Sequence, residues 1–374
     1  MGYDKLIIWI LEIVAAWVVI FGLQIPLRRS YHPIIRTIVF IIKVLMIPAA
    51  ALCFVAIEEP MAYVHGDKLT AIYIALAGDI AASVIEYLIR RIGYIRREKS
   101  ERPACKFVLL GFLSLLLCFG VLIYGIWDSG TIVKEKHVWK AEGLSQPHTF
   151  AFVSDLHAGS TQSAGTLREM CRQINDEEVE FLILGGDITD ELSTYEDMED
   201  VYSIFWDLDM PIYFIYGNHD RQERAGSLGE RTYEDQDLAK AMKRYGIKPL
   251  ADEYLQVADD LVLLGREDLS SKNRKPWSEL KNPYEGQGAL IVADHQPLDR
   301  KQLSAEESVL QISGHTHAGQ LWPLQLVYNA MDIPAYGEYR QPKSLLYVSA
   351  GAGNWMIPLR TEERCQWDLI TLEP

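Results

Sequence analysis

Cysteine is scarce in this sequence, and basic residues are fewer than acidic ones. Five cysteines are spread over 374 residues, and their placement implies no disulfide framework. Neither an internal repeat nor a low-complexity tract is visible. These absences exclude a small disulfide-stabilised scaffold and a repeat array. The organisation of the chain must therefore be inferred from the distribution of charged and apolar residues.

The acidic excess lies almost wholly in the last two-thirds of the chain. Residues 1–128 carry 13 Lys/Arg and 10 Asp/Glu, whereas residues 129–374 carry 23 and 41, a net charge of about −18. A domain this acidic repels long polyanions, and we therefore expect no nucleic-acid partner. The stretch from 129 to 374 is also long enough to bury a core of its own.

The first third of the chain is dominated by apolar segments. Each of four segments has close to the roughly 20 residues that cross a bilayer: 6–26, 34–57, 69–88 and 107–127. A single cleavable signal peptide does not account for four of them. We therefore expect an all-α transmembrane bundle over residues 1–128. The third segment also fits a buried soluble helix, because Asp79 and Glu86 interrupt it.

Two charged residues inside these segments are expected to pair. Lys43 in the second segment and Asp79 in the third fall at similar depth, because a helix rises about 1.5 Å per residue. Charged side chains inside a membrane face protein rather than lipid. The small residues Ala71, Ala75 and Gly78 permit close approach of another helix to the third segment.

Basic residues in the connecting loops predict the topology. The first loop contains Arg28 and Arg29, and seven lysines and arginines lie between 90 and 106, whereas the second loop has only Lys68. Basic loops stay on the cytoplasmic side, so both termini and the acidic domain are expected on the extracytoplasmic side. If the third segment does not span, the same rule places the domain in the cytoplasm.

Polar clusters follow five apolar runs of the acidic domain. The runs 149–153, 179–184, 211–216, 289–293 and 309–313 have the composition of buried strands. A helical pattern over 165–175 separates the first two, which indicates a largely parallel sheet with ligands at the carboxyl ends of its strands. The clusters are Asp155-Leu156-His157, Gly186-Asp187, Gly217-Asn218-His219-Asp220, Asp294-His295 and Gly314-His315-Thr316-His317.

The side chains in these clusters suit divalent metal ions. They supply carboxylates, an amide oxygen and imidazoles but no cysteine, which disfavours a thiolate-rich structural zinc site. Seven strong candidate ligands are too many for one tetrahedral ion, but they suit two ions that share a carboxylate. Such a pair can hold both the entering and the leaving oxygen of a displacement at phosphorus. Phosphoester hydrolysis is therefore the expected chemistry.

The order DxH, GD, GNHD, a lone histidine and GHTH resembles the calcineurin-like metallophosphoesterase superfamily over about residues 131–374. The resemblance implies a two-sheet α/β sandwich over 129–374, with helices outside, and two divalent ions chosen among Mn, Fe, Zn and Mg. It implies the following ligands: Asp155, His157 and His317 for the first ion, Asn218, His295 and His315 for the second, and Asp187 as the bridge.

The resemblance also implies catalytic roles. A hydroxide between the ions would attack phosphorus, His219 would protonate the leaving oxygen, and Asp220 would orient His219. The expected substrate is a small phosphoester or a lipid headgroup. Two alternatives stay open: a membrane sensor or scaffold whose domain only binds a ligand, and a cytoplasmic phosphodiesterase for soluble nucleotides.

Differences from the motifs of other members of this superfamily indicate which of its branches the chain resembles. Protein Ser/Thr phosphatases carry an arginine shortly after GD, and purple acid phosphatases carry a tyrosine where Asp190 stands. The runs 314–320 and 348–353 instead resemble the membrane-associated bacterial branch, which implies a bacterial cell membrane, although Ala318 replaces its usual glycine. Arg221 and Arg360 each fit either a contact with substrate phosphate or a structural salt bridge.

Overall fold

The computed structural model describes residues 3–22, 33–56, 59–96, 103–158, 162–223, 230–297, 309–341 and 344–374. The contacts within the chain divide it into two compact units. One comprises Met1–Trp127 and Leu321–Val327, and the other comprises Asp128–Gln320 and Tyr328–Pro374. The strands of the described residues all lie in the second unit.

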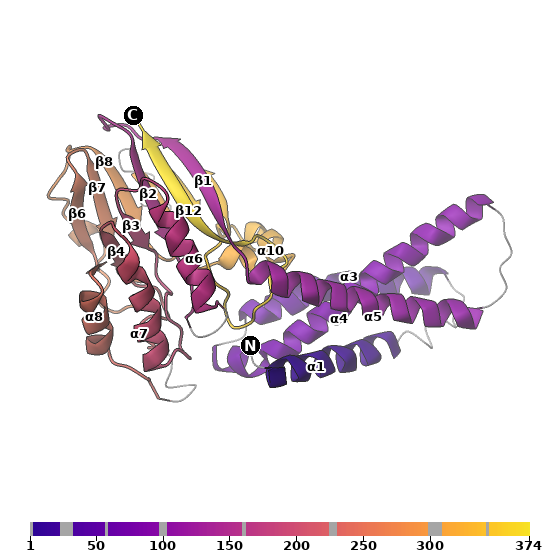
Figure 1. Ribbon diagram of the computed structural model, residues 1–374. Coiled ribbons are helices and arrows are strands. Elements are labelled where there is room, and N and C mark those ends of the chain that lie inside the picture. Colours follow the sequence, from indigo (N-terminus) through magenta and orange to yellow (C-terminus); the bar gives the residue numbers. More distant parts are fainter. Residues whose placement is uncertain are drawn as a thin grey trace. The chain divides into compact units, whose positions relative to one another are not determined.

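Four helices form most of the first unit (Figure 1): α1 (Tyr3–Gly22), α3 (Pro33–Ala56), α4 (Glu59–Arg96) and α5 (Pro103–Ser129). The described residues of the four predicted apolar segments are thus helical. Among the described residues, Gly66–Ile89 and Leu109–Ser129 are long and apolar enough to cross a membrane, and Ile7–Gly22 and Thr37–Ile47 are shorter apolar helices. The third predicted segment, which Asp79 and Glu86 interrupt, lies in α4 and is therefore one of the two that are long and apolar enough to cross a membrane.

The expected pair between α3 and α4 is confirmed. Lys43 Nζ lies 2.6 Å from Asp79 Oδ2, and the side chains are 10% and 1% exposed. Burial of a lone charge in an apolar environment is unfavourable, so each side chain offsets the other. Gly78 explains the close approach of α4 and α5, because a Cβ atom there would lie 2.4 Å from Cys118 Sγ.

The second unit contains two six-stranded sheets. Their strand orders are β1-β12-β2-β3-β4-β5 and β10-β11-β9-β8-β7-β6. The first sheet consists of β1 (Ile132–Lys140), β2 (His148–Val153), β3 (Leu182–Leu184), β4 (Ile212–Ile215), β5 (Ile247–Leu250) and β12 (Cys365–Glu373). The second consists of β6 (Glu253–Ala258), β7 (Leu261–Gly265), β8 (Ala289–Ala293), β9 (Val309–Ser313), β10 (Gly337–Arg340) and β11 (Ser344–Val348).

The centre of each sheet is parallel. Strands β2 to β5 run parallel in the first sheet, as do β7, β8, β9 and β11 in the second. The described residues from 128 to 374 also include the helices α6 (Ala164–Asn175), α7 (Tyr195–Ile204), α8 (Asp235–Arg244) and α10 (Leu324–Ala330), and the short 3₁₀ turns η1 (Phe205–Asp207), η3 (Trp277–Glu279) and η4 (His317–Gly319). Residues 324–327 of α10 belong to the first unit. The sequence pattern also favours a helix at 298–307, and this stretch lies outside the described residues.

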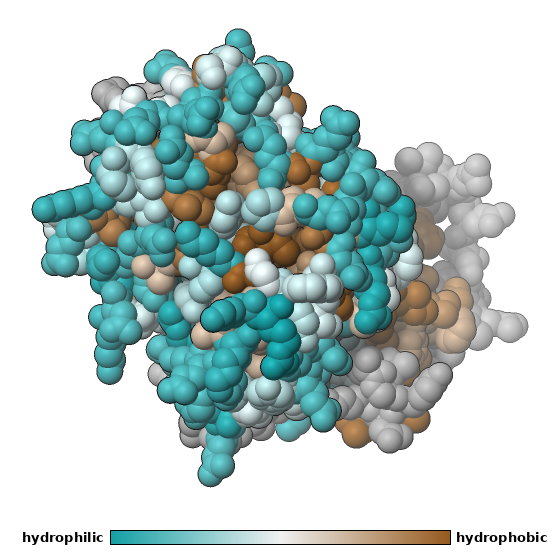
Figure 2. Space-filling view, turned by 60° about the vertical axis from the view of Figure 1, so that its left-hand side comes forward, coloured by the Kyte–Doolittle hydropathy of each residue, from teal (hydrophilic) through white to brown (hydrophobic). Residues whose placement is uncertain are grey.

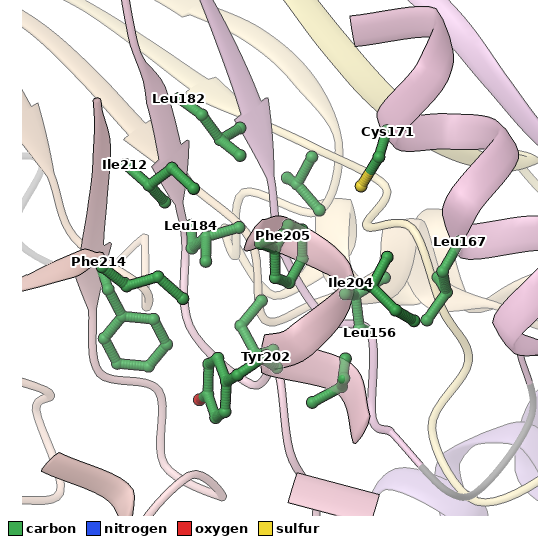
Figure 3. Close-up of a cluster of buried hydrophobic side chains, with 14 of the residues drawn as sticks. Leu156, Leu167, Cys171, Leu182, Leu184, Tyr202, Ile204, Phe205, Ile212 and Phe214 are labelled. Carbon is green, nitrogen blue, oxygen red and sulfur yellow. The ribbon is translucent and has the colours of Figure 1, made fainter. Parts of the chain in front are cut away.

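Side chains that alternate along the strands form two cores. Phe150 and Phe152 of β2 join a core between the sheets with Leu263 and Ile291 of the second sheet. Their neighbours Ala151 and Val153 point to the opposite face, toward the helices. Figure 3 shows this outer core, in which residues of β3 and β4 meet Tyr202, Ile204 and Phe205. The predicted α/β sandwich with helices outside is confirmed.

A buried histidine joins the two sheets near the start of β2. His148 Nδ1 lies 2.8 Å from Glu180 Oε2, and its Nε2 lies 2.7 Å from Asp260 Oδ1 in the turn between β6 and β7. Burial by itself lowers the pKa of this imidazole, but hydrogen bonds to the two carboxylates outweigh burial and raise the pKa above its usual value.

This pair of bonds predicts a pH-dependent stability. The pKa of His148 in the folded state exceeds the unfolded value of about 6.5. The two hydrogen bonds therefore stabilise the fold fully below pH 6.5, and this stabilisation is lost as the pH rises through the folded-state pKa. We expect His148→Asn to lower stability by about 1 kcal/mol at low pH and by less above the folded-state pKa, since solvent screens the half-exposed Glu180. Thermal midpoints of the detergent-solubilised proteins, measured from pH 5.5 to 9, check this; parallel pH profiles would contradict it.

Candidate metal centre

The five polar clusters lie together at the carboxyl ends of β2, β3, β4, β8 and β9. Two groups of three side chains result: Asp155, His157 and His317 form one, and Asp187, His295 and His315 form the other. Within each group the potential ligand atoms all lie within 4.8 Å of one another. The structure therefore brings six of the seven sequence-predicted ligands into two groups.

The carboxylate of Asp187 lies next to both groups. Its Oδ2 is 3.0 Å from His295 Nε2 and 3.9 Å from His157 Nε2. In the first group, His317 Nε2 lies 3.1 Å from His157 Nε2 and 3.5 Å from Asp155 Oδ1. Two ring nitrogens and a carboxylate oxygen that converge in this way surround a point suited to a cation.

The seventh predicted ligand, Asn218, follows β4 with a buried amide. Among the described residues, its Oδ1 has no hydrogen-bond partner. A buried carbonyl oxygen without a donor is unfavourable unless something else satisfies it, and a cation does so. The donor set of this site, with oxygen and imidazole ligands, therefore fits divalent metal ions.

Metal binding requires neutral imidazoles and ionised carboxylates, and His315, His317 and Asp187 meet this requirement. His295 differs: burial opposes its charge, but the neighbouring Asp187 outweighs burial and holds the pKa of that imidazole well above its usual value. Burial, reinforced by the charge of His295, lowers the pKa of His315 to about 4. Burial and the neighbouring His157 hold the pKa of His317 well below its usual value. Burial opposes ionisation of Asp187, but the nearby His295 and His219 outweigh it and hold the pKa of that carboxyl well below its usual range.

The ligands sit on strained backbone. Asp155, His157, Asp187, His315 and His317 have φ angles of 56°, 46°, 51°, 73° and 49°, in the left-handed region that favours glycine. Such conformations persist only where the surroundings enforce them, and they cluster at functional sites. A sequence pattern does not reveal this strain, although the turns that follow each strand predict sharp changes of direction.

Two glycines allow the carboxylates to approach the backbone. A Cβ atom on Gly217 would lie 2.2 Å from Asp187 Oδ1, and one on Gly314 would lie 2.2 Å from Asp155 Oδ2. The same carboxylates accept N–H hydrogen bonds from the ligand loops: His219 donates to Asp187 Oδ1 at 2.9 Å, and His315 donates to Asp155 Oδ1 at 3.0 Å. Glycine is therefore needed at the first position of GNHD and of GHTH, because a side chain there would collide with the carboxylate of a candidate ligand.

Hydrogen bonds behind the ligands fix two of the imidazole rings. His157 Nδ1 lies 2.8 Å from Asp190 Oδ2, and His295 Nδ1 lies 2.8 Å from the carbonyl oxygen of Gly185. In both rings the other nitrogen, Nε2, is the one near Asp187. Burial raises the pKa of Asp190, but its hydrogen bond with His157 outweighs burial and lowers the value to about 2. Carboxylates and carbonyls in this position orient metal-binding histidines.

Asp220 has a different set of partners from the one expected. Its carboxylate accepts N–H hydrogen bonds from Asp187, Ile188 and Thr189 at 2.8, 2.9 and 3.1 Å, and from Gly217 at 2.7 Å. Burial, with the charge of Asp187, raises the pKa of Asp220 to about 6 although these bonds oppose the shift. Asp220 therefore joins the GD turn to the GNHD turn.

The buried carboxylate of Glu191 lies beside the His219 ring instead. Its Oε1 is 3.7 Å from His219 Nδ1, and its side chain is fully buried. Sequence reasoning did not single out this residue, whose one signal is an acidic side chain directly after Asp190. On the other side of the ring, His219 Nε2 lies 4.0 Å from Asp187 Oδ2. His219 thus lies between the candidate ligands and an acid that can orient it.

Both arginines left open by the sequence have structural partners. Arg221 forms a two-pronged salt bridge with Glu267 at 2.7 and 2.9 Å and stacks on Tyr216, with Cζ 3.6 Å from the ring centroid. Arg360 is fully buried and donates to the carbonyl oxygens of Ala350 and Gly353 at 2.7 Å each. The salt-bridge alternative therefore describes Arg221, and Arg360 holds the loop that follows β11.

The loop held by Arg360 adjoins the candidate ligands. The guanidinium Nη2 lies 3.3 Å from His317 Nδ1, and Trp355 of the same loop has its ring centroid 6.4 Å from that of His219. Gly351 also packs against a ligand, because a Cβ atom there would lie 2.7 Å from Asp155 Cβ. The sequence run 348–353 indicated the resemblance to the membrane-associated branch, but it did not reveal that this loop contacts the candidate ligands His317 and Asp155.

Fold and site together define a metal-binding α/β sandwich with its donors at the carboxyl ends of the strands. Residues 148–319 match the calcineurin-like phosphoesterase family. This stretch of the chain is a calcineurin-like phosphoesterase domain, as the motifs predicted.

Relatives come from several organisms. An uncharacterized metallophosphoesterase of Helicobacter pylori is 27% identical over 73% of this chain and 72% of its own length. A transmembrane protein with metallophosphoesterase domain from Danio rerio is 27% identical over 70% of this chain and 62% of its own length. Among solved structures, a dimetal phosphatase from Danio rerio is 15% identical, with a TM-score of 0.36 over 55% of this chain and 87% of that one.

Proposed function

We propose that this protein is a membrane-anchored phosphoesterase that uses two divalent metal ions to hydrolyse a phosphomonoester or phosphodiester. The observation that carries the proposal is that Asp187, a member of the second group, lies 3.0 Å from His295 of its own group and 3.9 Å from His157 of the first group. The match of residues 148–319 to the calcineurin-like phosphoesterase family supports the reaction class. The buried oxygen of Asn218 supports its role as the fourth ligand of the second group.

Different residues of the chain would have different roles in hydrolysis. When bound, the ions supply Lewis acidity and lower the pKa of water toward 7. The two ligand groups would hold the ions, and the turn fixed by Asp220 keeps Asp187 in place. His219, only slightly exposed, lies beside Asp187 and would donate a proton to the leaving oxygen. Glu191, on the other side of the ring, would hold its orientation.

Removal of metal is the direct test of this proposal. We expect excess chelator to lower the turnover of bis(p-nitrophenyl) phosphate by at least about 100-fold, because the ions would both activate water and polarise the phosphoryl oxygens. Turnover should return on addition of one of Mn, Fe, Zn or Mg, with two ions bound per chain by elemental analysis. Undiminished turnover in chelator would defeat the proposal.

We further propose that the chain is an integral protein of the cell membrane with its catalytic domain on the extracytoplasmic side. The two long apolar stretches in α4 and α5 support the anchor, and relatives named transmembrane proteins are consistent with it. The basic first and third loops support the orientation. We also propose that the boundary between anchor and catalytic domain lies at 128/129.

Protease accessibility in intact cells tests the orientation. Protease added outside should digest the catalytic domain, tagged after Pro374, without permeabilisation of the inner membrane. A cytoplasmic reporter protein should stay intact in the same sample. Digestion of the domain only after permeabilisation would instead favour the cytoplasmic alternative, a phosphodiesterase for soluble nucleotides.

A further inference from the structure

The segment that follows the GHTH loop is uncharged and apolar. From Ala318 to Met331 the chain contains no acidic or basic residue, although the domain around it is strongly acidic. Within this stretch Leu321–Val327 belongs to the unit formed by the N-terminal helices, whereas His317 belongs to the other unit. The chain thus passes from a candidate metal ligand into the helical unit within four residues.

Two large side chains of this segment are exposed. Trp322 and Leu326 are 51% and 60% exposed, whereas their neighbours Leu321 and Leu324 are each 1% exposed. The buried leucines attach the segment to protein, and the other two project from it. Exposure of this kind contrasts with the face shown in Figure 2, where hydrophilic residues cover most of the surface and hydrophobic ones gather near the middle.

The helical unit indicates what covers these side chains. Along α5, large apolar side chains such as Leu109, Phe112 and Ile123 are 60–67% exposed, and a bilayer is the environment in which that is favourable. Near the end of α5, Tyr124 and Trp127 are 48% and 55% exposed with ring centroids 6.2 Å apart. Tyrosine and tryptophan concentrate where a membrane meets water.

We propose that Trp322 and Leu326 insert into the headgroup layer of the bilayer, and that the metal site takes phosphoesters carried by membrane lipids. The step to the substrate class rests on the proposed function, whereas the lipid contact does not. Because Trp322 follows the candidate ligand His317 by only five positions, the chain between them is too short for His317 to lie far from a segment seated in the headgroup layer. A soluble phosphoester gains nothing from such a contact.

Fluorescence quenching tests the lipid contact without any substrate. The full-length protein and its Trp322→Phe variant are placed in nanodiscs of phosphatidylcholine brominated near the glycerol end of its acyl chains. We expect the wild type to lose more emission than the variant, because bromine quenches only tryptophans within contact range. The other tryptophans contribute equally to both proteins. Equal fractional quenching would show that something other than lipid covers Trp322 and would overturn the proposal.

Two substrates with the same leaving group test the substrate class. One is soluble bis(p-nitrophenyl) phosphate, and the other is a phosphatidyl p-nitrophenyl ester in phosphatidylcholine nanodiscs. We expect the double variant Trp322→Gln, Leu326→Gln to lower lipid turnover by at least about tenfold and soluble turnover by no more than about twofold. Trp206→Gln, which removes an exposed tryptophan of η1, is the matched control and should change neither.

Each outcome decides a different claim. An equal fall with both substrates, or no fall with either, would overturn the lipid substrate. If the wild type hydrolyses neither ester with any divalent metal, the proposed function fails, and the quenching measurement alone still decides the lipid contact. A selective loss of lipid turnover together with selective quenching supports the whole inference.

Discussion

Asp187→Asn is expected to lower phosphoester turnover by about 1,000-fold or more and to reduce the metal content of the protein. The substitution preserves shape, because an asparagine Oδ1 can still accept the N–H of His219 that Asp187 Oδ1 accepts at 2.9 Å. It removes the negative charge that lies 3.0 Å from His295 and 3.9 Å from His157. Two divalent cations near each other then lack the anion that offsets their repulsion.

Elemental analysis and turnover, measured on the same preparation, check this prediction. Asp209→Asn is a suitable control, because it makes the same chemical change at an exposed position outside the site. Thermal stability of the apo proteins should separate a folding defect from a binding defect. An Asp187→Asn protein that keeps two ions and full turnover would remove the bridge from the mechanism.

His219→Ala is expected to lower kcat by roughly 100- to 1,000-fold for esters with a basic leaving group, while both metal ions stay bound. The loss should be much smaller for p-nitrophenyl esters, because a weakly basic phenolate leaves without protonation. The structural reason is position: the ring lies beside Asp187 and Glu191 but outside both three-residue ligand groups.

A series of leaving groups measures this effect directly. The slope of log kcat against leaving-group pKa should become steeper in the variant, and His219→Gln should match His219→Ala because neither side chain donates a proton from an imidazolium. Equal losses for all leaving groups, or loss of both ions, would assign His219 to metal binding instead.

The order of strands predicted a parallel sheet with the candidate ligands at one end of its strands, whereas the two-sheet sandwich was implied by the resemblance to the superfamily. Residues such as Asp155 and His315 stand directly after buried strands, and parallel strands bring their carboxyl ends to one edge of a sheet. The pairing of Lys43 with Asp79 was equally accessible, since helical rise converts residue number into depth.

The roles of Asp220 and Glu191 were not accessible in the same way. The partners of Asp220 are backbone N–H groups of residues 187–189 and 217, and every sequence offers such groups at every position. Which side chain reaches them depends on the φ angles of the turns, such as 51° at Asp187. The order of residues alone therefore did not reveal that the carboxylate of Glu191 lies beside His219.

The pairing of β1 with β12 affects how the domain is assembled during synthesis. Strand β1 emerges directly after α5, yet it lies at the edge of its sheet with β12 as its one described neighbour, along the register Ile132↔Cys365 to Lys140↔Glu373. Until residues 365–373 have been translated, β1 and one edge of β2 stay open. Contacts this distant in sequence form slowly. Completion of this sheet is thus a late event in the synthesis of the chain, and before it the open sheet edge is exposed to chaperones and proteases.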